Sequence, residues 1–163
     1  MKIALLAGVL SFVLPGAISA QAQLTTEAST GESQIFTRAN DLGLDLWRAQ
    51  DKFNARDFQG ADAILRDAAN QTMSAQVQLM AGLASAGVGD LNRARTHLRY
   101  ALSLQPRYVD AKVVLAIVSK RLGDTETAIR LRDDIEARAT ACDSKCSSAA
   151  SLARGAAALR KMI

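Results

Sequence analysis

The sequence predicts an all-helical protein built from repeated pairs of helices. Of its 163 residues, 49% are hydrophobic but only 4% are aromatic, and Ala and Leu, both strong helix formers, dominate. There are only two prolines and no alternating runs rich in Val, Ile and Thr, which argues against a sheet. Residues 74–135 also align with themselves at a fixed offset. That offset, about 34 residues, is typical of helical repeat arrays.

The positions that match across this offset are small or turn-forming residues. They pair Gly82 with Ala116, Gly89-Asp90 with Gly123-Asp124, and Ala94 with Ala128. The apolar stripe matches only in part, because Leu98 meets Arg132 while Ala101 meets Ile135. Small residues at fixed spacing let two helices approach closely, so the repeat predicts fold more directly than function.

Residues 1–22 have the pattern of a secretory signal peptide. Lys2 precedes an uncharged run from Ile3 to Leu14, and Ala20-Gln21-Ala22 is an A-x-A cleavage pattern. An uncleaved anchor is the competing interpretation, but the run is shorter than the roughly 20 residues that a bilayer span needs. We therefore expect a periplasmic or secreted bacterial protein with no membrane span after cleavage. Residues 23–34 are expected to be a flexible lead-in, and residues 35–163 a helical-repeat domain.

Seven helices are expected in order along the chain, each supported by helical spacing of apolar residues and by capping or breaking residues at its ends. They are residues 34–54, 58–70, 74–87, 91–104, 108–122, 125–141 and 147–161. Asp57, Asp90 and Asp124 are candidate N-caps. Gly82 lies in the middle of the third helix, where a glycine usually means that another helix packs closely against it.

These residues resemble a tetratricopeptide repeat array over about residues 40–160. The resemblance is carried by Gly82, Gly89-Asp90, Ala94, Leu98, Ala101 and Pro106. It implies a right-handed α-solenoid of about three helical hairpins plus a C-terminal capping helix. The spacing from Asp57 to Asp90 is one position shorter than that from Asp90 to Asp124, so the first pair is a degenerate repeat or one with a shortened turn. Ala150 lies one further period beyond Ala116, which implies that the last helix is a capping half-repeat.

Cys142 and Cys146 are the two cysteines of the chain. An even number in an oxidising compartment favours a structural disulfide, which would pin the capping helix. A metal or copper-thiolate site and a redox role are the alternatives. The spacing is C-x-x-x-C, whereas redox enzymes more typically use C-x-x-C in a βαβ setting.

The interspersed charges and the lack of catalytic motifs argue against several classes of function. Without residues 1–22 the chain has 19 basic and 16 acidic residues, interspersed rather than clustered, which does not favour nucleic acid. The only histidine, His97, lies among Arg93, Arg95 and Arg99. That group is either an anion site or the solvated outer face of a helix. No catalytic set of side chains can be assembled, so we expect a protein that is not an enzyme and needs no cofactor or metal.

The resemblance implies that the first helix of each pair lines a concave groove for a peptide or a partner protein, possible cell-envelope partners included. The groove candidates are Trp47, Gln50, Asn54, Gln76, Leu79, Leu83, Ala86, Asp110, Val113, Ile117, Lys120 and Arg121. Lys120 and Arg121 would hold an acidic group at one end. The alternative for the four aliphatic candidates is that they belong to the core. The leading hypothesis is a periplasmic scaffold, and the second is a redox or metal-handling accessory protein that uses Cys142 and Cys146.

Overall fold

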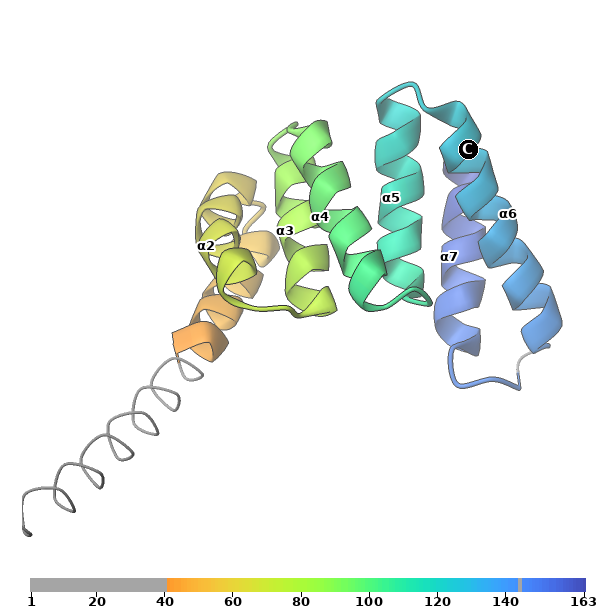
Figure 1. Ribbon diagram of the computed structural model, residues 1–163, viewed down its shortest axis with the longest axis horizontal. Coiled ribbons are helices and arrows are strands. Elements are labelled where there is room, and N and C mark those ends of the chain that lie inside the picture. Colours follow the sequence, from red (N-terminus) through yellow and green to blue (C-terminus); the bar gives the residue numbers. More distant parts are fainter. Residues whose placement is uncertain (1–40, 144) are drawn as a thin grey trace, which may run out of the picture. The chain divides into compact units, whose positions relative to one another are not determined.

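The computed structural model describes residues 41–143 and 145–163, and residues 42–163 form one compact unit (Figure 1). Residues 41–54 are helical and are called the first helix below. The helices that follow are α2 (Phe58–Gln71), α3 (Ala75–Gly87), α4 (Leu91–Leu104), α5 (Val109–Arg121), α6 (Thr125–Cys142) and α7 (Ala149–Met162). The predicted signal peptide, the lead-in and the start of the predicted domain at residue 35 lie outside the described residues.

The helix ends agree with the sequence prediction to within two residues wherever the structure describes them. Asp57, Asp90 and Asp124 all act as N-caps. Their carboxylates accept hydrogen bonds from the backbone N–H groups of Gly60, Arg93 and Thr127, at 2.8, 3.0 and 3.1 Å. The cap bond from Thr127 lowers the pKa of Asp124 below its ordinary value, since it stabilises the carboxylate over the acid.

The turn before each of these caps is the same in all three hairpins. The residue preceding the cap has a left-handed backbone, with φ of 91° at Gly89, 83° at Gly123 and 58° at Arg56. The first hairpin therefore does not have a shortened turn. The spacing from Asp57 to Asp90 is one residue shorter because the connection to the next pair is shorter. That connection is residues 72–74 after α2 but residues 105–108 after α4.

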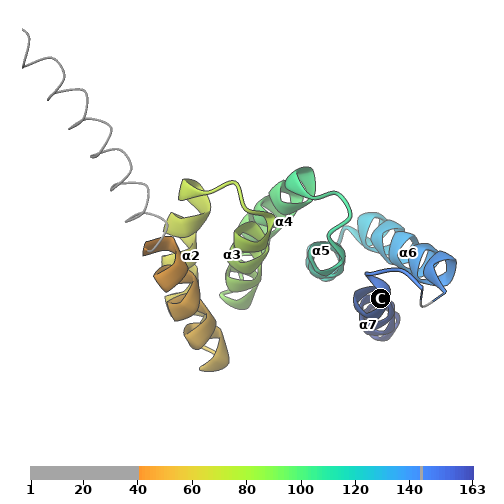
Figure 2. The same ribbon diagram turned by 90° about the horizontal axis from the view of Figure 1, so that it is seen from below.

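The helices form two layers. The first helix, α3, α5 and α7 make one layer, and α2, α4 and α6 make the other (Figure 2). Small residues allow the two layers to approach: Ala61, Ala94 and Ala128, which are equivalent in the three hairpins, are all fully buried. A Cβ atom on Gly82 would lie 2.8 Å from Cγ of Leu98, so α4 packs directly on α3 at this glycine, as predicted.

The core consists of three clusters, one at each junction between neighbouring pairs. The first cluster joins the first helix, α2 and α3, and the second joins α3, α4 and α5. The third joins α5, α6 and α7, with Leu152, Ala156 and Leu159 supplied by α7. Each cluster thus joins both helices of one pair to the first helix of the next, as expected of a solenoid.

The capping helix departs from the period of the repeat. The start of α5 at Val109 follows the start of α3 at Ala75 by one full period, but α7 begins only at Ala149, later than the period would place it. The cause is an α6 of 18 residues, against 14 in α4, followed by an extended loop. Ala150 is therefore exposed and is not the structural equivalent of the buried Ala116. Gly155 lies against α5 instead, where a Cβ atom would be 2.8 Å from Cγ2 of Val113.

The two cysteines lie at the end of α6 and in the loop that follows it. Cys142 ends α6, and its Sγ is bonded to Sγ of Cys146. Asp143 follows α6 in the left-handed conformation. The disulfide therefore joins the end of α6 to the segment that leads into α7. In the part of the chain that the structure describes, no helix combines the length and the apolar character that crossing a membrane requires.

Candidate binding surface

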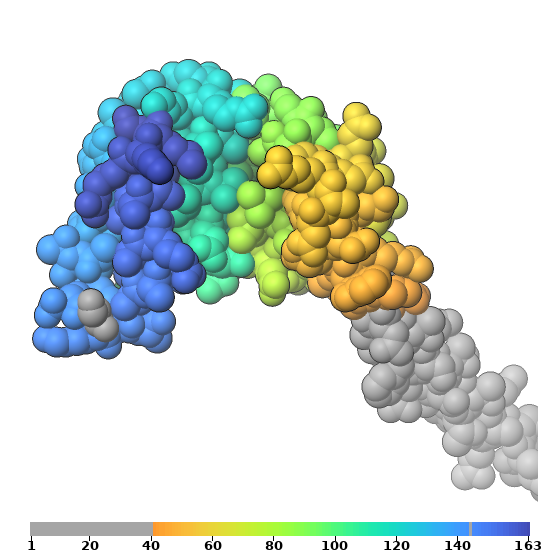
Figure 3. Space-filling model, turned by 180° about the vertical axis from the view of Figure 1, so that it is seen from behind, coloured from red at the N-terminus to blue at the C-terminus, as the bar shows by residue number. Residues whose placement is uncertain are grey.

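The first helix, α3 and α5 share one face of the array, which we call the inner face. Figure 3 shows it as a hollow, with residues 42–54 at one side, α7 at the other, and α3 and α5 between them. Gln50, Leu83 and Ile117 are equivalent positions on this face, related by the same spacings as the three N-caps. Gln50 is exposed, the Leu83 side chain is 38% exposed, and Ile117 is half-buried against the third core cluster.

Two of the aliphatic candidates are less available than predicted. Leu79 is buried in the second core cluster with Ala111 and Leu115 of α5. Its prediction as a groove residue is corrected, because it belongs to the core that α3 shares with α4 and α5. Val113 is half-buried and lies under Gly155 of α7. Leu83 is therefore the one large aliphatic candidate on α3 that the neighbouring helices leave exposed.

Trp47 belongs to a different surface from Gln50. Its equivalents, Met80 and Val114, pack into the cores shared with the preceding pair of helices. Trp47 is 69% exposed. Leu44 is 47% exposed, whereas its equivalents Val77 and Ala111 are buried. These two residues lie where a preceding repeat would pack. We call them the N-terminal end face.

The predicted basic end of the groove lies where the C-terminal ends of α3, α5 and α7 come together. Arg121 donates to the carbonyl oxygen of Ala86 at 3.4 Å, and Lys120 donates to the carbonyl oxygen of Met162. Both side chains are exposed. Helix C-termini carry partial negative charge, so these cations link helix ends and keep donors available to a ligand.

The remaining groove candidates are polar or small. Gln50 donates to the side-chain oxygen of Asn54 at 3.3 Å, and this bond is exposed. Gln76 and Asp110 are exposed at the starts of α3 and α5, and Ala86 is half-buried at the end of α3. They give the rim of the inner face its polar character.

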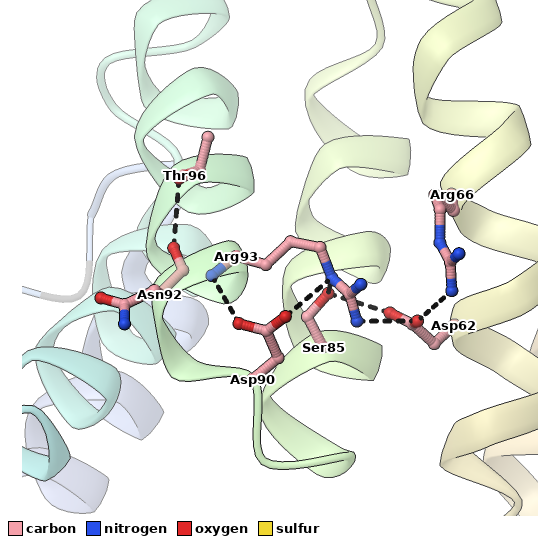
Figure 4. Close-up of polar contacts among 7 residues, drawn as sticks. All are labelled: Asp62, Arg66, Ser85, Asp90, Asn92, Arg93 and Thr96. Atoms are coloured by element: carbon pink, nitrogen blue, oxygen red, sulfur yellow. Dashed lines mark hydrogen bonds and ion pairs between the residues drawn. The ribbon is translucent and has the colours of Figure 1, made fainter.

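A buried polar cluster joins α2, α3 and α4, and no sequence pattern pointed to it (Figure 4). The buried carboxylate of Asp62 accepts from Oγ of Ser85 at 3.0 Å, from Nη2 of Arg93 at 2.8 Å and from Nη2 of Arg66 at 3.0 Å. Nε of Arg93 also donates to Ser85 at 3.1 Å. The cluster is not repeated, because Arg95 and Ile129 stand at the positions equivalent to Asp62. Periodicity therefore gave no signal for it.

His97 is half-buried, and one of its ring nitrogens has a partner on α3. Its Nδ1 lies 2.8 Å from Oε1 of Gln78, whose Nε2 donates to the carbonyl of Ala69. Burial, followed by the positive charge of Arg93, lowers the pKa of His97 below its ordinary value. Arg93 is bound to Asp62, Arg95 donates to Asn92 of its own helix, and Arg99 is exposed, so the predicted basic group does not act as one set.

The disulfide uses both cysteine side chains of the chain. In residues 41–143 and 145–163, no three His, Cys, Asp or Glu side chains are grouped so that they could hold a metal ion. The inner face is thus the surface on which Gln50, Leu83 and Ile117, three of the predicted site residues, occupy equivalent positions.

Comparisons with known proteins agree on the fold. No family model matches the sequence, and no curated protein matches it. Among solved structures, the chain is similar to the TPR2B domain of yeast Sti1, solved as a TPR2B-domain:pHsp70 complex. The TM-score is 0.62 at 14% sequence identity, over 76% of this chain and 98% of that domain. The predicted tetratricopeptide-like helical-repeat fold is therefore confirmed.

Proposed function

We propose that this tetratricopeptide-like array is a non-enzymatic scaffold that binds a segment of a partner protein on its inner face. The exposed Leu83 carries the proposal. It lies on α3 and is 38% exposed, and α3 is one of the two helices between the first helix and α7 in the hollow (Figure 3). An aliphatic side chain that neighbouring helices leave uncovered in a concave surface is a natural contact for an apolar side chain of a partner.

The chemistry of the surface defines the segment that it would bind. Leu83 and the exposed part of Ile117 favour apolar side chains, and Lys120 with Arg121 favours a carboxylate at one end. The partner segment is therefore apolar with an acidic side chain or chain terminus. The yeast domain of similar structure was solved in a complex, which supports the use of this fold for binding.

A photoreactive residue at position 83 tests the proposal, with position 129 as a matched control. Ile129 is also 38% exposed but lies on α6, in the other layer. We expect one defined protein to crosslink from position 83, no such product from position 129, and loss of the product when Lys120 and Arg121 are both changed to Glu. Equal products from both positions, or none from position 83, would contradict the proposal.

The site of action that we propose is the bacterial periplasm, on the basis of the signal-peptide pattern in residues 1–22. Cell fractionation followed by mass determination of the purified protein tests this. We expect a periplasmic protein whose first residue is Gln23. A cytoplasmic protein that retains residues 1–22 would contradict the location without affecting the binding proposal.

A further inference from the structure

A cavity of 470 Å³ lies at the other end of α5 from Lys120 and Arg121. Its walls come from the start of α5, the end of α6, the disulfide loop and the start of α7. The charged lining residues are Arg107, Lys112, Asp134 and Arg138, and the disulfide and Leu152 form an uncharged part of the wall. The volume is in the range of small-molecule sites in proteins.

Positive charge exceeds negative charge in this cavity. Three cationic side chains face one carboxylate, and Oδ2 of Asp134 lies 2.6 Å from Nζ of Lys112 and 3.8 Å from Nη1 of Arg138. The Lys112 and Arg138 side chains are only 16% and 25% exposed. Water therefore screens their charges less than it screens charges on an open surface.

Arg138 has a buried donor that the described residues do not satisfy. Its Nη2 reaches the carbonyl oxygen of Arg107 at 3.4 Å. Its Nη1 is buried and makes no hydrogen bond within residues 41–143 and 145–163, since Oδ2 of Asp134, at 3.8 Å, is beyond hydrogen-bond distance. Leaving a buried charged donor without an acceptor is costly, and such groups often mark the place of a bound water or ion.

The fold does not require these charges. At the equivalent positions of the preceding repeat, Met73, Gln78, Tyr100 and Leu104 stand in place of Arg107, Lys112, Asp134 and Arg138. The preceding repeat therefore lacks this charged set, which the last repeat carries where the long α6 and the disulfide loop break the period.

We propose that this cavity binds a small oxyanion, a carboxylate or a phosphate group, at the guanidinium of Arg138. The anion neutralises the excess charge and accepts a hydrogen bond from the guanidinium of Arg138, the group that pairs with both kinds of oxyanion. The site is separate from the inner face, so its ligand is not the partner segment proposed above.

Titration of the full-length mature protein with inorganic phosphate and with acetate tests the site. Amide chemical shifts are recorded at constant ionic strength against sodium chloride. We expect saturable shifts at the start of α5 and the end of α6. Tighter binding of phosphate identifies a phosphate ligand, and tighter binding of acetate identifies a carboxylate. If neither anion gives saturable shifts beyond those of chloride, the proposal is wrong.

Variants distinguish anion binding in the cavity from non-specific attraction by surface cations. Arg138→Gln and Lys112→Gln should each raise the dissociation constant at least tenfold. Arg154→Gln, which removes an exposed cation on α7 outside the cavity, should leave it unchanged. Circular dichroism checks the fold, and Lys112→Gln decides the outcome if Arg138→Gln does not fold. An equal loss of affinity in Arg154→Gln would overturn the proposal.

Discussion

The two ends of the array are built differently. At the C-terminal end, α7 covers the last hairpin and buries Leu152, Ala156 and Leu159. At the N-terminal end, Leu44 and Trp47 stand exposed at positions whose equivalents pack into the core in both following pairs. A hairpin in a solenoid buries its faces against its neighbours, so a terminal hairpin needs a cap. The described part of the chain supplies a cap at one end only.

The largest expected effect is at the capped end. Leu159→Ala removes a fully buried side chain of α7 and should lower the free energy of unfolding by about 3 kcal/mol, because it leaves a cavity in the third core cluster. Urea unfolding followed by circular dichroism measures this. Met162→Ala, at an exposed position of the same helix, should change stability by less than about 0.5 kcal/mol. Similar losses for the two variants would contradict the view that α7 is a packed cap.

Equivalent positions compare the open end with the interior directly. Val77→Ala should lower the free energy of unfolding by about 2 kcal/mol, since Val77 is buried between the first two pairs. Leu44→Ala should cost less than about 0.5 kcal/mol, because nearly half of Leu44 is already exposed. Thermal unfolding of the two variants provides the measurement. A comparable loss at Leu44 would mean that something covers the N-terminal end face.

Removal of the disulfide should loosen the cap without unfolding the repeats. The Cys142→Ser, Cys146→Ser double variant opens a five-residue loop, which the chain-entropy model values at about 2 kcal/mol. Because the loop joins only α6 to α7, the effect should stay local. Hydrogen exchange should become faster in α7 and remain unchanged in α3 and α4. Faster exchange throughout the array would show that the disulfide supports the whole fold.

The first hairpin has a strained turn that the others avoid. Arg56 holds φ at 58°, where Gly89 and Gly123 stand in the other turns. A left-handed backbone costs most residues about 1–2 kcal/mol, and a glycine would remove this cost. The greater freedom of glycine in the unfolded chain offsets part of that gain. Arg56→Gly should therefore raise stability by about 0.5 kcal/mol. Gly89→Ala, the matched change in the second turn, should lower the thermal midpoint, and a gain there would contradict the strain argument.

His97, on α4 in the middle of the array, should make the free energy of unfolding depend slightly on pH. This small effect can be compared with the larger effects expected at the two ends. The pKa of His97 is lowered from 6.5 by burial and by Arg93. The folded chain therefore binds fewer protons than the unfolded chain just below pH 6.5. The contribution of His97 to the free energy of unfolding should be fully present above that pH and should decrease as the pH falls toward the lowered pKa. Urea unfolding between pH 7.5 and pH 5 should show this loss, and His97→Asn should reduce it. An unchanged slope in His97→Asn would assign the effect to other groups.

The parts of the fold that repeat were predictable from the sequence, and the parts that do not repeat were not. Asp57, Asp90 and Asp124 act locally, through the first turn of their own helices, so a short motif identified all three caps. The cluster around Asp62 depends on three helices and has no counterpart in the other pairs. The register of α7 was missed for the same reason, since the loop that shifts it occurs once.

The groove candidates show the same limit. Periodicity placed Gln50, Leu83 and Ile117 on one face, and the structure places Leu83 on α3 and Ile117 on α5, the first helices of their pairs. Periodicity could not distinguish Leu79 from Leu83, because both belong to the apolar side of α3. Only the packing of α4 and α5 with α3 buries Leu79 and leaves Leu83 exposed. Trp47 was placed in the groove by its repeat register, whereas its equivalents face the preceding pair.

The sequence by itself determined the helices, their caps and the close approach at Gly82, since these depend on local backbone chemistry and on the size of single side chains. Only the tertiary structure decided which apolar residues remain exposed, where the charges around Asp62 and Arg138 meet, and that one end of the array has a cap while the other exposes Leu44 and Trp47. The physical reason is that burial and charge pairing depend on neighbouring helices, and neighbours are set by packing along the whole array.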